Sequence, residues 1–137
     1  MFQGYLSEHG GAIGLVAIGG ALGATLRFGT GAIAGEALLV TLLINAIGSF
    51  GLGCLLFEAR AEELLSQRFR YLFGSGFFAS FTTYSTFIAD IALHAPELAI
   101  AYGLASYGAG FGGVLASREL IRLHSRASLA PTNGGKR

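Results

Sequence analysis

Long uncharged and largely apolar stretches dominate the chain, and short segments between them carry most of the charges. The uncharged stretches are 10–26, 37–57, 71–89 and 98–117, which have 17, 21, 19 and 20 residues. After Arg27, the first stretch continues without charge as far as residue 35. About 20 residues of α-helix cross the ~30 Å hydrocarbon core of a bilayer. The pattern therefore predicts four membrane-spanning helices, at about 10–33, 37–57, 71–92 and 98–120.

The segments between these stretches are short, so the pattern predicts a single four-helix domain over residues 1–126. Connections are expected near Gly35, at 58–70 and at 90–97, where Pro96 suits a turn between helices. Residues 127–137 are polar and contain proline and glycine, which predicts a disordered cytoplasmic tail.

Composition narrows the class of protein. Hydrophobic residues make up 53% and charged residues 12% of the 137 positions, and the net charge is +1. Average soluble domains carry about 25% charged residues. The low charge excludes a disordered chain and gives no basic field for nucleic acid. We therefore expect an all-α integral membrane protein, embedded in the lipid bilayer of the plasma or inner membrane as a multi-pass chain.

The cationic residues are distributed unevenly about the predicted spans. Four spans place both termini and the 58–70 connection on one side, which holds eight of the nine cations, while Arg27 belongs to the other side. The eight are Arg60, Arg68, Arg70, Arg118, Arg122, Arg126, Lys136 and Arg137. Cytoplasmic loops carry an excess of Lys and Arg, so both termini are predicted to be cytoplasmic.

Small residues are concentrated in three of the predicted spans. Faces of small residues let helix backbones approach closely in lipid. The residues are Gly19, Gly20, Gly23, Ala24, Gly48, Ser49, Gly51, Gly53, Gly103, Gly108, Gly110, Gly112 and Gly113. Because four short helices hardly enclose a substrate path, we expect an oligomer.

Polar side chains at membrane depth need a partner or a function. Asn45 lies near the middle of the second span, one turn after Thr41. Its amide suits either a hydrogen bond between helices or a donor that faces a transported ligand. Arg27, near the end of the first span, suits either an interfacial position or a fixed charge that concentrates anions.

The third predicted span contains an unusual density of hydroxyl groups. Six of them fall within twelve residues that begin beside Gly74 and Gly76: Ser75, Ser80, Thr82, Thr83, Ser85 and Thr86. Back-bonding to helix carbonyls accounts for one or two of them. The group as a whole predicts a helix broken at mid-membrane, which is tolerated where backbone is buried in protein or lines a cavity. Since no span contains a carboxylate in its core, neutral donors favour an anion over a cation or drug as cargo.

Three segments resemble motifs of the Fluc (CrcB) family of small fluoride channels. They are Gly19-Gly20-Ala21-Leu22-Gly23-Ala24-Thr25-Leu26-Arg27-Phe28, Thr41-Leu42-Leu43-Ile44-Asn45-Ala46-Ile47-Gly48-Ser49-Phe50 and Thr82-Thr83-Tyr84-Ser85-Thr86-Phe87. They are similar to the family's glycine-rich first helix ending in Arg and an aromatic residue, its Thr-x-x-x-Asn-x-x-Gly-Ser stretch and its Thr-Thr-Phe-Ser-Thr-Phe signature. The resemblance covers nearly the whole chain and fades after Arg126.

This resemblance implies an antiparallel dimer with two pores that passes fluoride passively out of the cell and so relieves fluoride toxicity. By position in the motifs, Asn45 donates to fluoride, Tyr84 and Phe87 border its path, and Ser85, Thr86 and Thr41 extend a polar track. Arg27 is included among the residues of the fluoride pathway. The resemblance also implies a structural Na⁺ at the dimer interface, held by the backbone carbonyls of Ala79 and Thr82 from both subunits.

The chain departs from the family pattern at two places in the third segment. Tyr84 stands where the family usually has Phe, which adds a hydroxyl group. Ala79-Ser80-Phe81 stands where a Gly-Gly pair usually precedes the two threonines, which reduces the conformational freedom of the turn.

The eight-to-one distribution of cations favours a single orientation. We therefore expect this chain to pair with an oppositely oriented homologous chain, with a dual-topology dimer of its own copies as the alternative. Other functions consistent with the length are a small four-helix multidrug-type exporter and a membrane scaffold without transport. An enzyme is disfavoured because His9, His94 and His124 lie at the ends of the spans or outside them, without a nucleophile or metal-binding neighbours.

Overall fold

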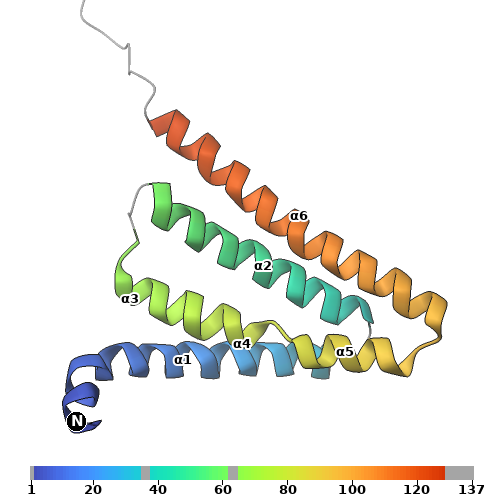
Figure 1. Cartoon of the computed structure of the whole chain (residues 1–137), viewed down its shortest axis with the longest axis horizontal. Coiled ribbons are helices and arrows are strands. Elements are labelled where there is room, and N and C mark those ends of the chain that lie inside the picture. The colour runs from blue at the N-terminus through green and yellow to red at the C-terminus, as the bar shows by residue number, and fades with distance from the viewer. Residues whose placement is uncertain (1, 35–37, 62–64, 129–137) are drawn as a thin grey trace, which may run out of the picture.

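The computed structural model describes residues 2–34, 38–61 and 65–128, and this part of the chain is helical apart from short connections. Three long helices are α1 (Phe2–Ala34), α2 (Leu38–Ala61) and α6 (Pro96–Ser128). Between α2 and α6 the chain forms α3 (Gln67–Phe69), the π-helical η1 (Arg70–Phe78), α4 (Ala79–Phe81) and α5 (Tyr84–Leu93). Helix α2 lies between α6 and the α3–α5 segment, and α1 packs along η1 and α4 (Figure 1).

The three long helices have the length and composition of membrane spans. Within the described residues, the apolar segments are His9–Ala34, Leu38–Ala59 and Pro96–Arg126, with mean hydropathies of 1.5, 2.0 and 1.4. Many large apolar side chains on them are exposed, such as Leu104 (72%) and Phe111 (70%). An apolar surface of this kind fits lipid rather than water. The chain is therefore a multi-pass membrane protein, as the sequence predicts.

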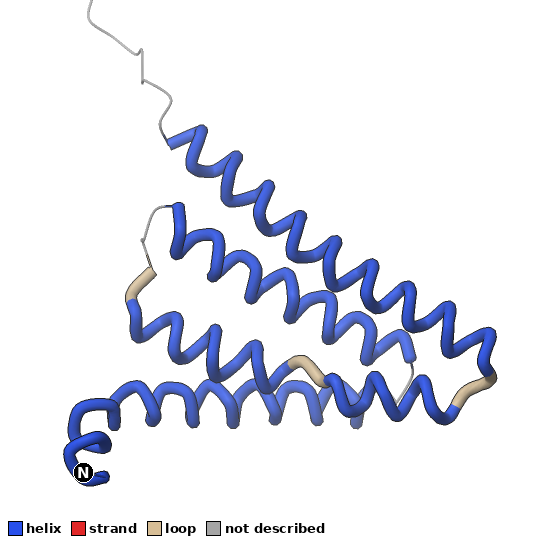
Figure 2. Tube along the Cα trace, in the orientation of Figure 1, coloured by secondary structure: helices blue, strands red, loops and turns tan. Residues whose placement is uncertain are grey.

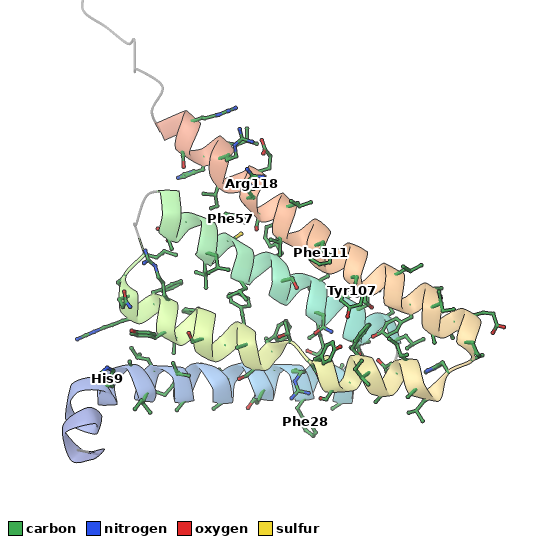
Figure 3. The ribbon with its side chains drawn as sticks, in the orientation of Figure 1. His9, Phe28, Phe57, Tyr107, Phe111 and Arg118 are labelled. Atoms are coloured by element: carbon green, nitrogen blue, oxygen red, sulfur yellow. The ribbon has the colours of Figure 1, made fainter. Side chains whose placement is uncertain are left out.

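The helix ends differ in detail from those expected. Helix α1 begins at Phe2, and α6 continues to Ser128, so residues 127 and 128 are helical rather than part of the expected tail. The first turns of α1 bend away from the rest near His9, just before the Gly10-Gly11 pair (Figure 3). The expected connection at Gly35 and the rest of the tail, 129–137, lie outside the described residues.

Glycines allow the backbones of α1 and η1 to touch. A Cβ atom at Gly19 would overlap the carbonyl of Leu72, and one at Gly23 would overlap the carbonyl of Phe77. From the other side, a Cβ at Gly76 would lie 2.7 Å from the carbonyl oxygen of Val16. The glycine-rich first helix thus packs against the broken segment of its own chain, which the sequence alone does not distinguish from a contact between subunits.

Small residues also join α2 to its neighbours. A Cβ at Gly113 would lie 3.1 Å from the carbonyl oxygen of Ala46, and one at Gly53 would overlap the buried hydroxyl of Ser117. A Cβ at Gly48 would overlap the methyl group of Thr82, beside the site where the third segment leaves helical geometry. Because Gly48 has no side chain, α2 can approach that site closely.

A buried carboxylate links the end of α2 to the residues that begin the third segment. Glu58, at the end of α2, accepts a hydrogen bond from the backbone N–H of Leu65 at 2.7 Å. Its other oxygen lies 3.9 Å from the guanidinium of Arg70 at the start of η1. These contacts set where the third segment begins, at the end of the molecule that also holds the N-terminus and the end of α6 (Figure 1).

Candidate functional site

The third segment leaves helical geometry at two adjacent threonines. Helix α4 ends at Phe81, Thr82 (φ −73°, ψ 159°) and Thr83 (φ −144°, ψ 118°) are extended, and α5 begins at Tyr84. Figure 2 shows the short loop that they form in the middle of the segment. The break that the hydroxyl-rich sequence predicts is thus present, eight residues after Gly74 and six after Gly76.

The two threonine hydroxyls cap the helix ends on either side of the break. Thr82 donates from both its backbone N–H (3.2 Å) and its hydroxyl (3.1 Å) to the carbonyl of Phe78. The hydroxyl of Thr83 accepts a hydrogen bond from the backbone N–H of Thr86 at 3.2 Å, as an N-cap residue does. The sequence predicts Thr83 only as one of six hydroxyl-bearing residues and assigns it no role in the site, although its position just before a helix is typical of an N-cap.

Asn45 of α2 holds the extended backbone of Thr83. Its side-chain Nδ2 donates to the carbonyl of Thr83 at 3.0 Å, and its Oδ1 accepts from the N–H of Thr83 at 2.8 Å. Both polar backbone groups of this buried residue are therefore satisfied by one side-chain amide, much as a neighbouring strand would satisfy them. The sequence allows Asn45 either to hydrogen-bond another helix or to donate to a ligand. In the structure its amide bonds to the third segment of the same chain.

A short row of hydroxyls begins at the break. The Thr83 hydroxyl donates to that of Thr86 at 2.9 Å and lies 3.3 Å from that of Ser85. Thr83 is buried, Thr86 is half-buried and Ser85 is exposed, so the row leads from the interior to the surface.

These hydroxyls face a pocket of about 840 Å³ between the end of α1, the start of α2 and α5. The polar side chains that line it are those of Arg27, Thr41, Thr83, Ser85, Thr86, Asp90 and His94. Thr41 is only 6% exposed. Four of the residues predicted for an ion pathway, Arg27, Thr41, Ser85 and Thr86, thus meet at one pocket.

Arg27 contacts the carbonyl end of α4. Its Nε donates to the backbone carbonyl of Ser80 at 3.3 Å, and the side chain is half-buried at the wall of the pocket. A cation at the end of a helix is favoured by the helix dipole and by the carbonyls left without helical donors. The following residue, Phe28, labelled in Figure 3, is 78% exposed and also lines the pocket.

The predicted aromatic residues lie apart from the pocket lining. The ring of Phe87 is 4% exposed and packs against Tyr107 of α6, edge to face, at a centroid distance of 5.6 Å. Tyr84 is 67% exposed, with its ring centroid 5.7 Å from that of Phe87. The ring of Tyr107 in turn stacks on that of Phe111, with their centroids 6.4 Å apart. The four rings form a row from the start of α5 along α6.

The carboxylate of Asp90 also reaches the pocket, although none of the predicted spans carries a carboxylate in its core. Asp90 of α5 accepts a hydrogen bond from the hydroxyl of Tyr102 at 3.1 Å, and Tyr102 is buried. The backbone carbonyl of Asp90 lies 2.7 Å from Nδ1 of His94. The sequence does not predict this hydrogen bond. Tyr102 and Asp90 are brought together only because α5 packs against α6.

The break leaves backbone carbonyls without their helical donors. In a continuous helix the N–H of Thr83 would bond to the carbonyl of Ala79, but here it bonds to Asn45. The Ser80 carbonyl is engaged by Arg27. Within the described residues, no group of three or more His, Cys, Asp or Glu side chains is placed to hold a metal ion.

Comparison with known proteins gives a consistent result. Residues 14–118 match the family model described as CrcB-like protein, Camphor Resistance (CrcB). The chain is 43% identical over 109 residues to fluoride-specific ion channel FluC 1 of Haloarcula marismortui, covering 80% of this chain and 84% of the relative. It is 46% identical over 108 residues to FluC 2 of Halobacterium salinarum (77% and 83% covered) and 37% identical over 115 residues to FluC 1 of Natronomonas pharaonis (83% and 97% covered).

Proposed function

Since the chain belongs to the CrcB family, we propose that it is a subunit of a fluoride channel that lets fluoride leave the cytoplasm down its gradient. The observation that carries this proposal is the similarity, over most of both chains, to relatives named as fluoride-specific ion channels. Passive permeation forms and breaks no covalent bond, so the proposed function is not that of an enzyme.

The chemistry of the pocket supports an anion as cargo. Fluoride is small and strongly hydrated, so a pathway must replace its water with other donors. The hydroxyls of Thr41, Ser85 and Thr86 are such donors, and the guanidinium of Arg27 adds positive charge at the wall. The negative charge of Asp90 opposes an anion in the same pocket, and the hydrogen bond from Tyr102 partly offsets it.

We assign Asn45 two roles in this channel. Its hydrogen bonds to Thr83 use Oδ1 and one of the two N–H bonds of Nδ2. The second N–H is left for fluoride. The rings of Tyr84 and Phe87 would border the path through their positive edges, and the exposed hydroxyl of Tyr84 adds a donor at this border.

A structural Na⁺ fits the donors at the break. Sodium is a hard cation and prefers oxygen ligands. The Ala79 carbonyl has lost its helical N–H to Asn45, while Arg27 occupies the carbonyl of Ser80. The carbonyls of Ala79 and Thr82 are therefore the ones that we propose for sodium, with the same two from a second subunit. The bound ion would hold the two breaks together and add positive charge near the anion path.

The proposed subunit crosses the membrane four times. Helices α1, α2 and α6 supply three crossings, and the α3–α5 segment supplies the fourth, broken at Thr82 and Thr83. Most of the cations lie at the end of the molecule where α1 begins and α6 ends. This excess supports a cytoplasmic location for the N- and C-termini. The assembly that we propose is an antiparallel dimer with an oppositely oriented homologous chain.

The pairing is tested by expressing this chain alone with a tag at one terminus. We expect the tag to be accessible from the cytoplasmic side only, and fluoride efflux to require a homologous chain. Robust efflux from the chain alone, with tags accessible from both sides, would establish the dimer of identical chains instead.

The role of the pocket is tested by fluoride efflux from liposomes. Thr41→Val keeps the shape of a buried side chain and removes its hydroxyl from the pocket. Loss of one hydrogen bond to an ion costs about 1.5–3 kcal/mol, so efflux should fall about tenfold or more. The matched control is Thr30→Val, because the Thr30 hydroxyl bonds to the carbonyl of Leu26 within α1 and does not line the pocket. Equal efflux from the two variants would contradict the assignment.

A further inference from the structure

Helix α6 continues well past its uncharged stretch and carries a row of arginines there. The uncharged stretch ends at Ser117, and Arg118, Arg122 and Arg126 follow at four-residue intervals within the same helix. Side chains four residues apart lie on one side of a helix, one turn after another. All three arginines are exposed, and we call them the arginine row.

The arginine row continues the apolar exposed face of α6. Leu104, Phe111 and Arg118 follow one another at seven-residue spacing, and so do Leu115 and Arg122, which places them on nearly the same side of the helix. Leu104, Phe111 and Leu115 are 72%, 70% and 62% exposed. Figure 3 shows Tyr107, Phe111 and Arg118 in this order along α6. A face that is apolar and then cationic matches a bilayer leaflet, from acyl chains to headgroups.

The depth of the arginine row also fits headgroups. The headgroup region extends roughly 5–7 Å beyond the hydrocarbon on each side, and a helix rises about 6 Å in four residues. Arg118 lies at the first position past the uncharged stretch, so Arg118 and Arg122 fall within the depth of the phosphates. Arg126 lies one turn further, and an arginine side chain is long enough to reach the phosphates from there.

The charge of the arginine row is mostly uncompensated. Glu119 pairs with Arg122 at 3.2 Å on the exposed surface. Within the described residues, neither Arg118 nor Arg126 has a carboxylate within 4.0 Å. The row and Glu119 together carry a net charge of +2, three positive charges against one negative charge.

We propose that the arginine row is a binding site for the headgroups of anionic phospholipids, such as phosphatidylglycerol. Each arginine near an anionic surface contributes on the order of a fivefold preference, so a net charge of +2 corresponds to roughly 25-fold stronger binding of the anionic lipid. This site is independent of the fluoride pathway, because none of its residues lines the pocket.

The test uses a tryptophan reporter, since the chain contains no tryptophan. Leu115→Trp places one fluorophore on the exposed face beside the arginine row. The purified full chain is reconstituted in two kinds of vesicle, both containing phosphatidylglycerol and phosphatidylcholine. In the first the phosphatidylglycerol is brominated, and in the second the phosphatidylcholine is brominated. Quenching then gives the relative affinity of the two lipids at this face. We expect a clear preference for phosphatidylglycerol, which weakens at high salt.

Three further variants in the reporter background separate charge from folding. Replacing all three arginines by Gln should remove the preference, whereas replacing them by Lys should retain it. Arg68→Gln, which removes an exposed arginine on α3 outside the row, should leave it unchanged. The proposal is overturned if the Gln variant keeps its preference, if the Lys variant loses it, or if neither lipid quenches the reporter.

Discussion

The hydrogen bonds between Asn45 and Thr83 should hold the helix break in place even without an ion. Asn45→Ala removes the partners of the Thr83 N–H and carbonyl, whose distances to the amide are 2.8 and 3.0 Å. Thr83 is 9% exposed, so water replaces these partners poorly. Leaving a buried group of this kind unsatisfied costs about 1–3 kcal/mol, and the two together destabilise the break by about 2–6 kcal/mol.

Hydrogen exchange at the Thr83 amide measures this loss directly. If the free energy of local opening at the break falls by about 2 kcal/mol, this amide exchanges roughly 30-fold faster. Asn45→Asp is the matched variant, because it keeps an oxygen acceptor for the Thr83 N–H and loses the donor to the carbonyl. We therefore expect slow exchange at this amide in Asn45→Asp. An unchanged exchange rate in Asn45→Ala would refute the view that Asn45 positions the break.

Two further variants test the packing around the site. Gly23→Ala should lower the melting temperature because its Cβ overlaps the carbonyl of Phe77, whereas Gly29→Ala, with no atom within 4 Å of its Cβ, should leave it nearly unchanged. Equal melting temperatures would contradict the backbone contact of α1 with η1. Phe87→Ala should destabilise the folded chain by about 3–5 kcal/mol because the ring is buried, and Phe28→Ala should have little effect because that ring is exposed. Denaturation in detergent, followed by circular dichroism, compares these two variants.

The membrane-spanning helices are the part of the fold that the sequence predicts best. Uncharged stretches long enough to cross a bilayer coincide with α1, α2 and α6, since lipid requires apolar side chains and internally bonded backbone. The third stretch was expected to break, and it does so at Thr82 and Thr83. The cause is visible only in the fold, because the Thr83 backbone is satisfied by Asn45, which lies 38 residues away in the sequence.

The fold brings only some of the predicted site residues together. Arg27, Thr41, Ser85 and Thr86 meet at one pocket, whereas Tyr84 and Phe87 lie in a row of rings beside α6. A motif indicates which side chains belong to a site but not which side of a helix faces which neighbour.

The sequence also left the partners of several side chains undefined. Asp90 and Tyr102 form a buried hydrogen bond that depends on the packing of α5 against α6. The glycines of α1, which suit contacts between any two helices, are used against η1 of the same chain. Such choices depend on tertiary packing, and short-range patterns do not contain them.

The most direct test of the account is fluoride efflux from liposomes that contain this chain together with a homologous chain of the same family, followed with a fluoride electrode. The account predicts rapid efflux down the fluoride gradient, absent from protein-free liposomes and strongly reduced by Thr41→Val in this chain. Efflux no faster than from protein-free liposomes, for this chain alone and for the pair alike, would contradict the proposal that it is a fluoride channel subunit.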